Sequence, residues 1–208
     1  MGRRSKQAQR CDRCRMHLAS CLCAKMPQFF LDTKLCLVMH CREVKKPTAT
    51  GPMALSILAN SERYVHGVPE HALDLTHLSH QGRRVIVLFP DEKSIPLDQL
   101  DRTADPRPLT LVVPDGNWRQ ASRVPRRVKG LEDSEWVTLP EGPATAWGIR
   151  RETREGGLAT FEAIARAMGC LESPEVALAM EDYFALAVRT TLEMRGTPGK
   201  EATLGVAP

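Results

Sequence analysis

The sequence predicts an α/β fold with a largely parallel sheet, preceded by a small cysteine-rich module. Three apolar runs, at residues 35–39, 84–90 and 109–114, are continuous rather than alternating, as expected of strands buried on both faces. Segments of helical character separate and follow these runs. This alternation is typical of layered α/β proteins, in which helices cover a parallel sheet.

The composition indicates one compact domain with a short N-terminal appendage. Of the 208 residues, 42% are apolar and 26% are charged, so the chain can bury a core and lacks the composition of a disordered protein. No apolar run reaches the roughly 18 residues that a membrane helix needs. The basic N-terminus leads into cysteines and not into the apolar stretch of a secretory signal. We therefore expect a cytoplasmic protein without membrane contact, with an N-terminal module at 1–30, a main domain at 31–195 and a frayed tail at 196–208.

Each expected element has its own signal in the sequence. Gly51 and Pro52 open an apolar helix, because proline favours the first helical turn. The run at 136–140 is a weaker strand than the first three, and an apolar stripe from Val176 to Leu192 predicts a long amphipathic helix. The expected strands are 35–39, 84–90, 109–114 and 136–140, and the expected helices are 51–60, 158–171 and 174–194.

Four cysteines near the N-terminus form a C-x2-C pair followed by a C-x-C pair: Cys11, Cys14, Cys21 and Cys23. Without a secretory signal a disulfide framework is not expected. Two close thiolate pairs suit one tetrahedral Zn²⁺, with sulfur ligands at about 2.3 Å. His17 lies between the pairs and is an alternative ligand, and reduced cysteines without metal are the other interpretation.

The remaining cysteines and several histidines are assigned structural positions. Cys36 and Cys170 are expected to be small core residues. For Cys41, at a strand end, packing is favoured over a chemical role. Four further histidines have no metal-site spacing and are expected on the surface: His66, His71, His77 and His80.

Polar side chains follow the predicted strands where a parallel sheet binds its ligands, beyond the carboxyl ends. Asp115 comes directly after a strand and precedes Gly116, so it is placed either to take a proton or orient a cation, or to cap the helix that begins near Asn117. Thr160 is expected to cap the helix at 158–171, and the free backbone N–H groups in the first turn of this helix would suit an anion. Glu162 lies in the first turn of that helix.

Other features of these loops leave their roles open. Trp118 either packs or stacks on a base, and His40 contacts a substrate or accepts a hydrogen bond in the core. No G-x-G-x-x-G and no G-x-x-x-x-G-K-[ST] occurs, which disfavours a standard dinucleotide site and a P-loop. Basic residues gather in clusters that either bind phosphates or are solvated surface: Arg3 to Arg15, Arg119 to Lys129, and Arg150 to Arg154.

Together, these segments resemble the DTW-domain family, which is named for an Asp-x-x-Trp signature. The matching residues stand in the family's order and span nearly the whole chain: Cys11-x2-Cys14, Cys21-x-Cys23, His40, Thr48-x-Thr50-Gly51, Pro114 to Ala121, Ile149-Arg150 and Thr160 to Ala163. The sequence departs from the family's usual pattern at Cys41, Ala49 and Asn117.

The resemblance implies a SPOUT-like fold with a knotted C-terminal region and a DTW catalytic domain at 31–195. Bacterial members of the family are tRNA-uridine aminocarboxypropyltransferases. The implied reaction moves the 3-amino-3-carboxypropyl group of S-adenosylmethionine to N3 of a tRNA uridine, with position 47 of the variable loop as the family expectation. The second product is 5′-methylthioadenosine.

The resemblance also implies roles for single residues. Asp115 is the expected catalytic residue, as the base that deprotonates N3 or as a partner of the donor's cationic groups. The expected donor-binding residues are Thr50, Gly51, Pro114, Asp115, Gly116, Trp118, Ile149, Arg150, Thr160 and Glu162. The expected RNA contacts are His40, Arg119, Arg123, Arg126, Arg127 and Arg151. The expected zinc ligands are Cys11, Cys14, Cys21 and Cys23, and no obligate protein partner is expected.

Two alternatives stay open at this point. A SPOUT-like RNA methyltransferase would share the fold and the donor but transfer the methyl group. A non-catalytic, zinc-containing RNA-binding protein would bind tRNA without S-adenosylmethionine and without turnover.

Overall fold

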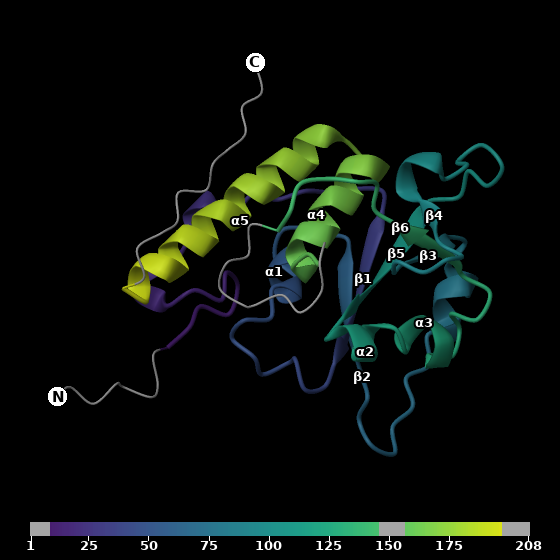
Figure 1. Cartoon of the computed structure of the whole chain (residues 1–208), viewed down its shortest axis with the longest axis horizontal. Helices are drawn as coiled ribbons and strands as arrows, with labels where there is room; N and C mark the ends of the chain where they lie inside the picture. The colour runs from purple at the N-terminus through teal and green to yellow at the C-terminus, as the bar shows by residue number, and fades with distance from the viewer. Residues whose placement is uncertain (1–8, 146–156, 197–208) are drawn as a thin grey trace.

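The computed structural model describes residues 9–145 and 157–196, which form an α/β fold around a sheet of six parallel strands (Figure 1). Across the sheet the strand order is β2-β1-β5-β3-β6-β4. The strands are β1 (Lys34–His40), β2 (Ser61–His66), β3 (Arg84–Leu88), β4 (Ile95–Pro96), β5 (Leu109–Asp115) and β6 (Glu135–Thr138). The predicted α/β class and parallel sheet are confirmed.

Each strand that was expected from an apolar run is present, and two more were missed. β2 is an edge strand that pairs only with β1 among the described strands, and most of its residues are partly exposed, so it carries polar side chains instead of an apolar run. β4 has two residues, which is too short to leave a pattern. Both lie at the edges of the sheet, where burial imposes little on the sequence.

The described helices are α1 (Gly51–Leu55), α2 (Trp118–Ala121), α3 (Val124–Arg127), α4 (Thr160–Leu171) and α5 (Pro174–Met194), with short 3-10 helices at Leu18–Ser20, Cys23–Lys25, Thr76–Gln81 and Leu97–Gln99. α1 is shorter than the predicted helix at 51–60. The chain after it pairs with the N-terminal segment, where Phe29 N–H donates to Ile57 O at 2.9 Å and Ala59 N–H donates to Phe29 O at 2.9 Å. None of the described helices is long and apolar enough to cross a membrane.

The two faces of the sheet are covered by different helices. Alternate residues of β1 enter different apolar clusters: Leu35, Leu37 and Met39 pack with α1, α4 and α5, whereas Cys36 and Val38 pack in the cluster that contains Val124 and Val128. This is the two-residue alternation of a strand that is buried on both faces. Figure 1 shows α4 and α5 on one side of the sheet and α3 on the other.

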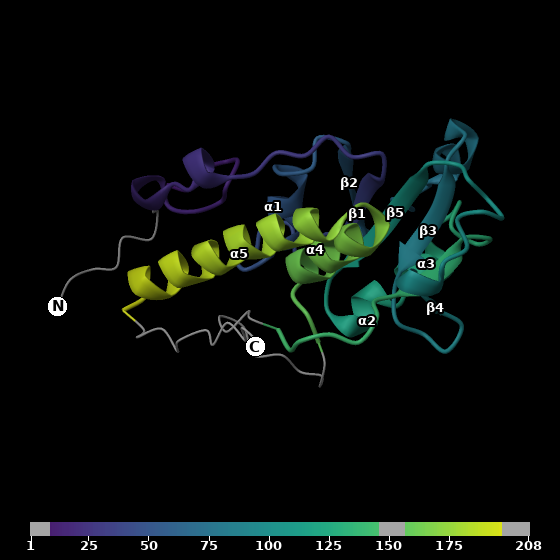
Figure 2. The same cartoon turned by 90° about the horizontal axis from the view of Figure 1, so that it is seen from above.

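α5 also reaches the N-terminal module. Figure 2 shows it running from beside the sheet toward the N-terminal segment. Cys14, Met16, Leu22 and Met26 share one apolar cluster with α5 side chains, and the rings of Phe161 and Phe184 stack at 4.9 Å between α4 and α5.

Two of the assigned structural positions are wrong. Cys170 is exposed near the end of α4 instead of buried in the core, whereas Cys36 is fully buried as predicted. His66 is buried and not on the surface, because it ends β2 beside His40 of β1.

Candidate active site and metal centre

Asp115 is the last residue of β5, the central strand that pairs with both β1 and β3. It is only 6% exposed, and its position in the sheet is opposite Met39. The predicted alternative, that Asp115 caps the following helix, is wrong. Asn117 caps α2 instead: its Oδ1 accepts from Gln120 N–H at 2.9 Å, and its own N–H donates to Gln120 Oε1 at 2.9 Å. The carboxylate of Asp115 is therefore not used as a helix cap.

The start of α4 lies against this carboxylate. Thr160 Oγ1 donates a hydrogen bond of 2.6 Å to Asp115 Oδ1. Thr160 is the first residue of the helix and Ala159 is at the cap position, so the prediction that Thr160 is the N-cap is wrong by one residue. Glu162, which is 4% exposed, accepts a hydrogen bond from Ala159 N–H at 2.9 Å and another from the hydroxyl of Thr145.

The start of α1 also lies beside the Asp115 carboxylate. Thr50 Oγ1 accepts a hydrogen bond of 3.2 Å from Phe161 N–H, which ties the loop before α1 to the first turn of α4. A Cβ atom on Gly51 would lie 2.9 Å from Asp115 Oδ2 and 3.1 Å from Leu37 Cδ1. Glycine at this position therefore lets the Asp115 carboxylate approach the first residue of α1.

The structure thus brings together Thr50, Gly51, Asp115, Thr160 and Glu162 of the ten residues predicted to bind a donor. Pro114 and Gly116 flank Asp115 in the chain, and Trp118 lies next to Phe89, with ring centroids 5.8 Å apart. Ile149 and Arg150 lie outside the described residues, as does Arg151 of the predicted RNA contacts. A buried carboxylate between two helix starts is an arrangement that can accept a proton or hold a cationic group.

His40 ends β1 next to this site and pairs in register with His66. Their rings meet edge to face at 5.0 Å. Burial lowers the pKa of His66 to about 4, and the charge of His40 adds to the shift. Burial also lowers the pKa of His40, and the Arg42 cation acts in the same direction. Both shifts favour the neutral form of the imidazole ring.

The position of the His40 ring is fixed from two sides. Its Nδ1 accepts a hydrogen bond of 3.1 Å from Arg42 N–H, so the neutral ring carries its proton on Nε2. Gly67 has φ of 75°, and a Cβ atom there would lie 2.8 Å from His40 Nε2. Sequence reasoning missed His66 as the partner of His40, because only the pairing of β1 with β2 brings them together.

The four predicted arginine contacts on α2 and α3, which are Arg119, Arg123, Arg126 and Arg127, are all exposed. Arg126 donates to Asp91 Oδ2 at 2.6 Å, and its guanidinium lies over the Trp136 ring at 4.9 Å from the centroid. The segment 118–127 contains no acidic residue. These side chains form a positive surface next to the carboxyl ends of the strands.

The predicted metal ligands lie together in the N-terminal module. The sulfur atoms of the four cysteines, which are Cys11, Cys14, Cys21 and Cys23, all lie within 4.8 Å of one another. Cys11 and Cys23 are 3.5 Å apart, and Cys14 and Cys21 are 3.7 Å apart, measured between sulfur atoms. Sulfur ligands at about 2.3 Å from one tetrahedral ion lie roughly 3.8 Å apart. The residues therefore fit a four-cysteine zinc site, and the group does not include His17.

The backbone around these cysteines prepares them for metal binding. N–H groups of Cys14 and Arg13 lower the pKa of Cys11 to about 6, which favours the thiolate. Arg15 adopts φ of 61° and donates its N–H to Cys11 O at 2.8 Å, which closes the turn that brings Cys11 and Cys14 together. Burial raises the pKa of Cys14, the one fully buried member.

Comparison with known proteins places these features in a family. The chain is 26% identical over 174 residues to tRNA-uridine aminocarboxypropyltransferase 2 of Drosophila melanogaster, covering 80% of this chain and 68% of that protein. It is 28% identical over 196 residues to tRNA-uridine aminocarboxypropyltransferase A of Arabidopsis thaliana, covering 79% and 73%. It is 23% identical over 174 residues to tRNA-uridine aminocarboxypropyltransferase 2 of Macaca fascicularis, covering 81% and 58%. No solved structure matches the chain significantly. The sequence pattern of the DTW domain matches residues 8–192, so the chain belongs to the DTW-domain family.

Proposed function

We propose that the protein is a tRNA-uridine aminocarboxypropyltransferase that uses S-adenosylmethionine as donor and modifies N3 of a uridine, with position 47 as the expected site. Membership of the DTW family and the names of the curated relatives support this assignment. The observation that carries it is the buried Asp115 carboxylate, which is held by Thr160 at the point where β5, α1 and α4 meet.

The chemistry requires two things of this site. All three carbons on the donor's sulfonium share one leaving sulfur, so the site must present the γ-carbon of the amino acid chain in line with N3. The uracil N3 carries a proton and is a poor nucleophile until that proton is removed. In the reaction the N3–Cγ bond forms, the Cγ–S bond breaks and the N3 proton goes to a base. The products are 5′-methylthioadenosine and the modified tRNA.

In this proposal Asp115 takes the N3 proton. Its alternative role is to bind the ammonium or sulfonium of the donor, which also uses a buried carboxylate. Thr160, Thr50, Gly51 and Glu162 shape the donor pocket around it, together with Gly116 and Pro114 of the predicted set. Arg150, which lies outside the described residues, keeps its predicted role as a partner of the donor carboxylate or of a phosphate. The pH dependence at saturating donor separates the two roles, because protonation of a base lowers kcat, whereas protonation of a donor anchor raises the KM for the donor.

The other parts of the chain belong to RNA binding. His40 and the arginines of α2 and α3 would contact the tRNA, and phosphate contacts of this kind make affinity depend on salt.

The four-cysteine centre would hold structural zinc, since four thiolates leave no open position for catalysis. The knotted SPOUT-type C-terminal region and the cytoplasmic location belong to the same proposal. The parallel sheet is compatible with a knotted SPOUT-type region. A metal-binding cluster of thiols suits the reducing environment of the cytoplasm.

The test is nucleoside mass analysis of unmodified tRNA that has been incubated with the pure protein and S-adenosylmethionine. A uridine heavier by about 101 Da, with release of methylthioadenosine, supports the proposal, whereas an increase of about 14 Da identifies a methyltransferase. Absence of any change, with tRNA bound, favours the non-catalytic RNA-binding alternative.

A matched pair of variants links the reaction to the site. We expect Asp115→Asn to lower turnover by about 100-fold or more while the protein stays folded. Asp98→Asn changes an exposed aspartate and should leave turnover unchanged. Equal activity of the two variants would exclude Asp115 from the reaction.

A further inference from the structure

An open pocket of about 860 Å³ lies beside the candidate active site, at the carboxyl end of β3. Its lining includes Phe89, Asp91, Trp118, Arg119 and Arg126. Phe89 comes directly after β3, and Trp118 begins α2 just beyond Asp115. The pocket is therefore built from loops at the same edge of the sheet as the carboxylate.

Aromatic rings form one wall of this pocket. Phe89 is 7% exposed, and its ring meets Trp118 at 5.8 Å and 66°. Phe89 also meets Trp136 at 6.5 Å and 89°. The buried phenylalanine thus supports two half-buried indole rings from below. Trp118 is half-buried and lines the pocket, so its indole contributes apolar surface on which a nucleobase can stack, and such stacking tolerates any base.

The charges of the pocket suit a nucleotide more than a neutral ring. Asp91 is neutralised by Arg126 at 2.6 Å. Arg119 is exposed, and no acidic side chain in residues 9–145 or 157–196 forms an ion pair with it. Glu92 is the remaining acidic lining residue, and the exposed Arg123 and Arg127 of the same chain segment add positive charge outside the lining. A phosphate next to the stacked base would therefore meet a guanidinium.

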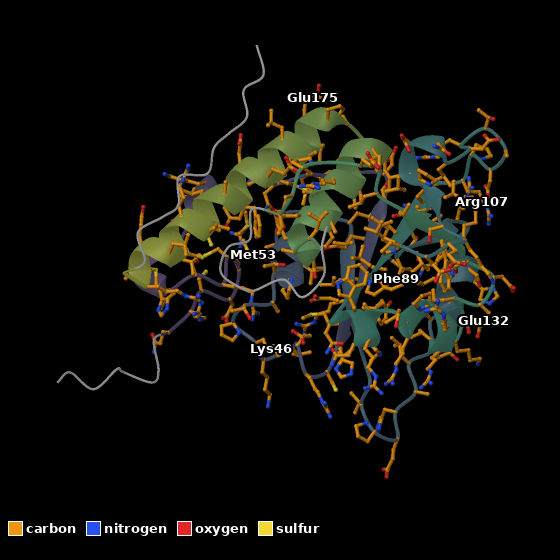
Figure 3. The ribbon with its side chains drawn as sticks, in the orientation of Figure 1. Lys46, Met53, Phe89, Arg107, Glu132 and Glu175 are labelled. Carbon is orange, nitrogen blue, oxygen red and sulfur yellow. The ribbon has the colours of Figure 1, made fainter. Side chains whose placement is uncertain are left out.

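The pocket and the Asp115 carboxylate lie on different faces of the sheet. Asp115 pairs with Met39, which packs with α1 and α4. Trp136 pairs in register with Val87, which belongs to the apolar cluster on the other face of the sheet. Phe89 lies two residues after Val87 in the chain, and its ring contacts the Trp136 ring. In Figure 3 the label of Met53 lies near α1, and that of Phe89 lies farther across the sheet, away from α1 and α4. A ligand in this pocket is thus separate from a donor held between α1 and α4.

We propose that this pocket binds an RNA nucleotide that flanks the modified uridine, with its base on Trp118 and its phosphate against Arg119. This assignment rests on the proposed function, which supplies the RNA substrate. It gives Trp118 an RNA-stacking role in place of a contact with the donor. An RNA strand that crosses the sheet edge would place one base at Asp115 and the neighbouring nucleotide in the pocket.

The test compares Trp118→Ala and Trp118→Phe in two direct binding measurements, one with a pool of unmodified tRNA transcripts and one with S-adenosylmethionine. We expect Trp118→Ala to weaken tRNA binding roughly tenfold, Trp118→Phe to retain most of it, and donor binding to stay the same in both. Weaker donor binding with unchanged tRNA binding would overturn the proposal, since the pocket would then hold the donor's adenine. Unchanged binding of both ligands would overturn it as well.

A second variant tests the phosphate contact without disturbing the aromatic wall. Arg119→Gln should lower the slope of log K for tRNA against log salt by about one, and Arg102→Gln, at an exposed arginine before β5, should leave it unchanged. An equal slope in the two variants would contradict the phosphate contact. Binding does not require turnover, so these results stand even where the wild-type protein yields no aminocarboxypropyl product, and failure of the two proposals is distinguishable.

Discussion

The hydroxyl of Thr160 donates a 2.6 Å hydrogen bond to Asp115 Oδ1 and so joins two residues that are 45 positions apart in the chain. It connects the end of the central strand to the first turn of α4. One oxygen of the carboxylate is thereby fixed by a donor, and the other lies close to Gly51. This contact helps to orient the buried carboxylate, because a hydrogen bond to one oxygen restricts rotation of the carboxyl group.

Thr160→Val removes this donor and keeps the branched shape of the side chain. We expect turnover to fall about tenfold and the free energy of unfolding to fall by about 1–3 kcal/mol, because a buried carboxylate loses a charge-assisted hydrogen bond. Thr160→Ser keeps the hydroxyl and should retain both. Single-turnover rates and urea unfolding measure the two effects, and equal rates for the valine and serine variants would show that the contact does not orient the carboxylate.

Gly51→Ala adds a methyl group between Asp115 Oδ2 and Leu37 Cδ1, at 2.9 Å and 3.1 Å. Neither neighbour can move easily, because both are buried. We expect a loss of about 1–3 kcal/mol in the free energy of unfolding and at least about a tenfold loss of turnover as the carboxylate is displaced.

Gly142→Ala is the matched control for this change. The methyl group would meet the end of the flexible Arg166 side chain at 3.3 Å and Pro140 O at an ordinary contact distance of 4.0 Å, and Gly142 is exposed. Stability should stay within about 0.5 kcal/mol of the wild type. If turnover falls equally in both alanine variants, the close approach at Gly51 is not the cause.

The sequence predicts the parts of the site that lie next to buried apolar runs. Asp115 is recognisable because β5 is continuous in apolar residues and stops at a carboxylate and a glycine. The four cysteines are recognisable because their ligand spacing is local. In both cases the signal lies within about a dozen consecutive residues, so it is visible without knowledge of the fold.

The contacts between these parts were not predictable from local patterns. The bond from Thr160 to Asp115 requires α4 to return to the end of β5, and the pair of His40 and His66 requires β2 to lie beside β1. Strand order is a long-range property, and the polar edge strand β2 gives no apolar signal. The same reason explains the wrong surface assignment of His66.

Removal of metal from the four-cysteine centre should destabilise more than the N-terminal module. Cys14 is fully buried in the cluster that also contains Met180, Tyr183 and Val188 of α5. We therefore expect one Zn²⁺ per chain, and loss of it by chelation or by Cys14→Ser to lower Tm by roughly 10 °C.

Cys170→Ser is the control, since Cys170 is exposed and lies outside the sulfur cluster. It should keep the metal and the Tm. Elemental analysis and thermal unfolding provide the readout. A wild-type protein that contains no zinc, or a Cys14→Ser variant that retains it, would contradict the assignment of a thiolate site.

Stability should fall with acid through His66. Burial lowers its pKa from 6.5 to about 4, so between these values the unfolded chain binds a proton that the folded protein excludes. The contribution of the neutral ring is present above pH 6.5 and is lost as the pH falls toward 4, and it amounts to about 3 kcal/mol. The nearest titrating neighbour is His40, whose pKa burial also lowers, so it acts in the same direction.

His66→Phe keeps a ring in contact with His40 and removes the titration, and His80→Gln changes an exposed histidine as a control. Urea unfolding at pH 7 and pH 4.5 should show a smaller difference for His66→Phe than for the wild type and His80→Gln, and the same difference in all three proteins would show that His66 is not held neutral by its burial.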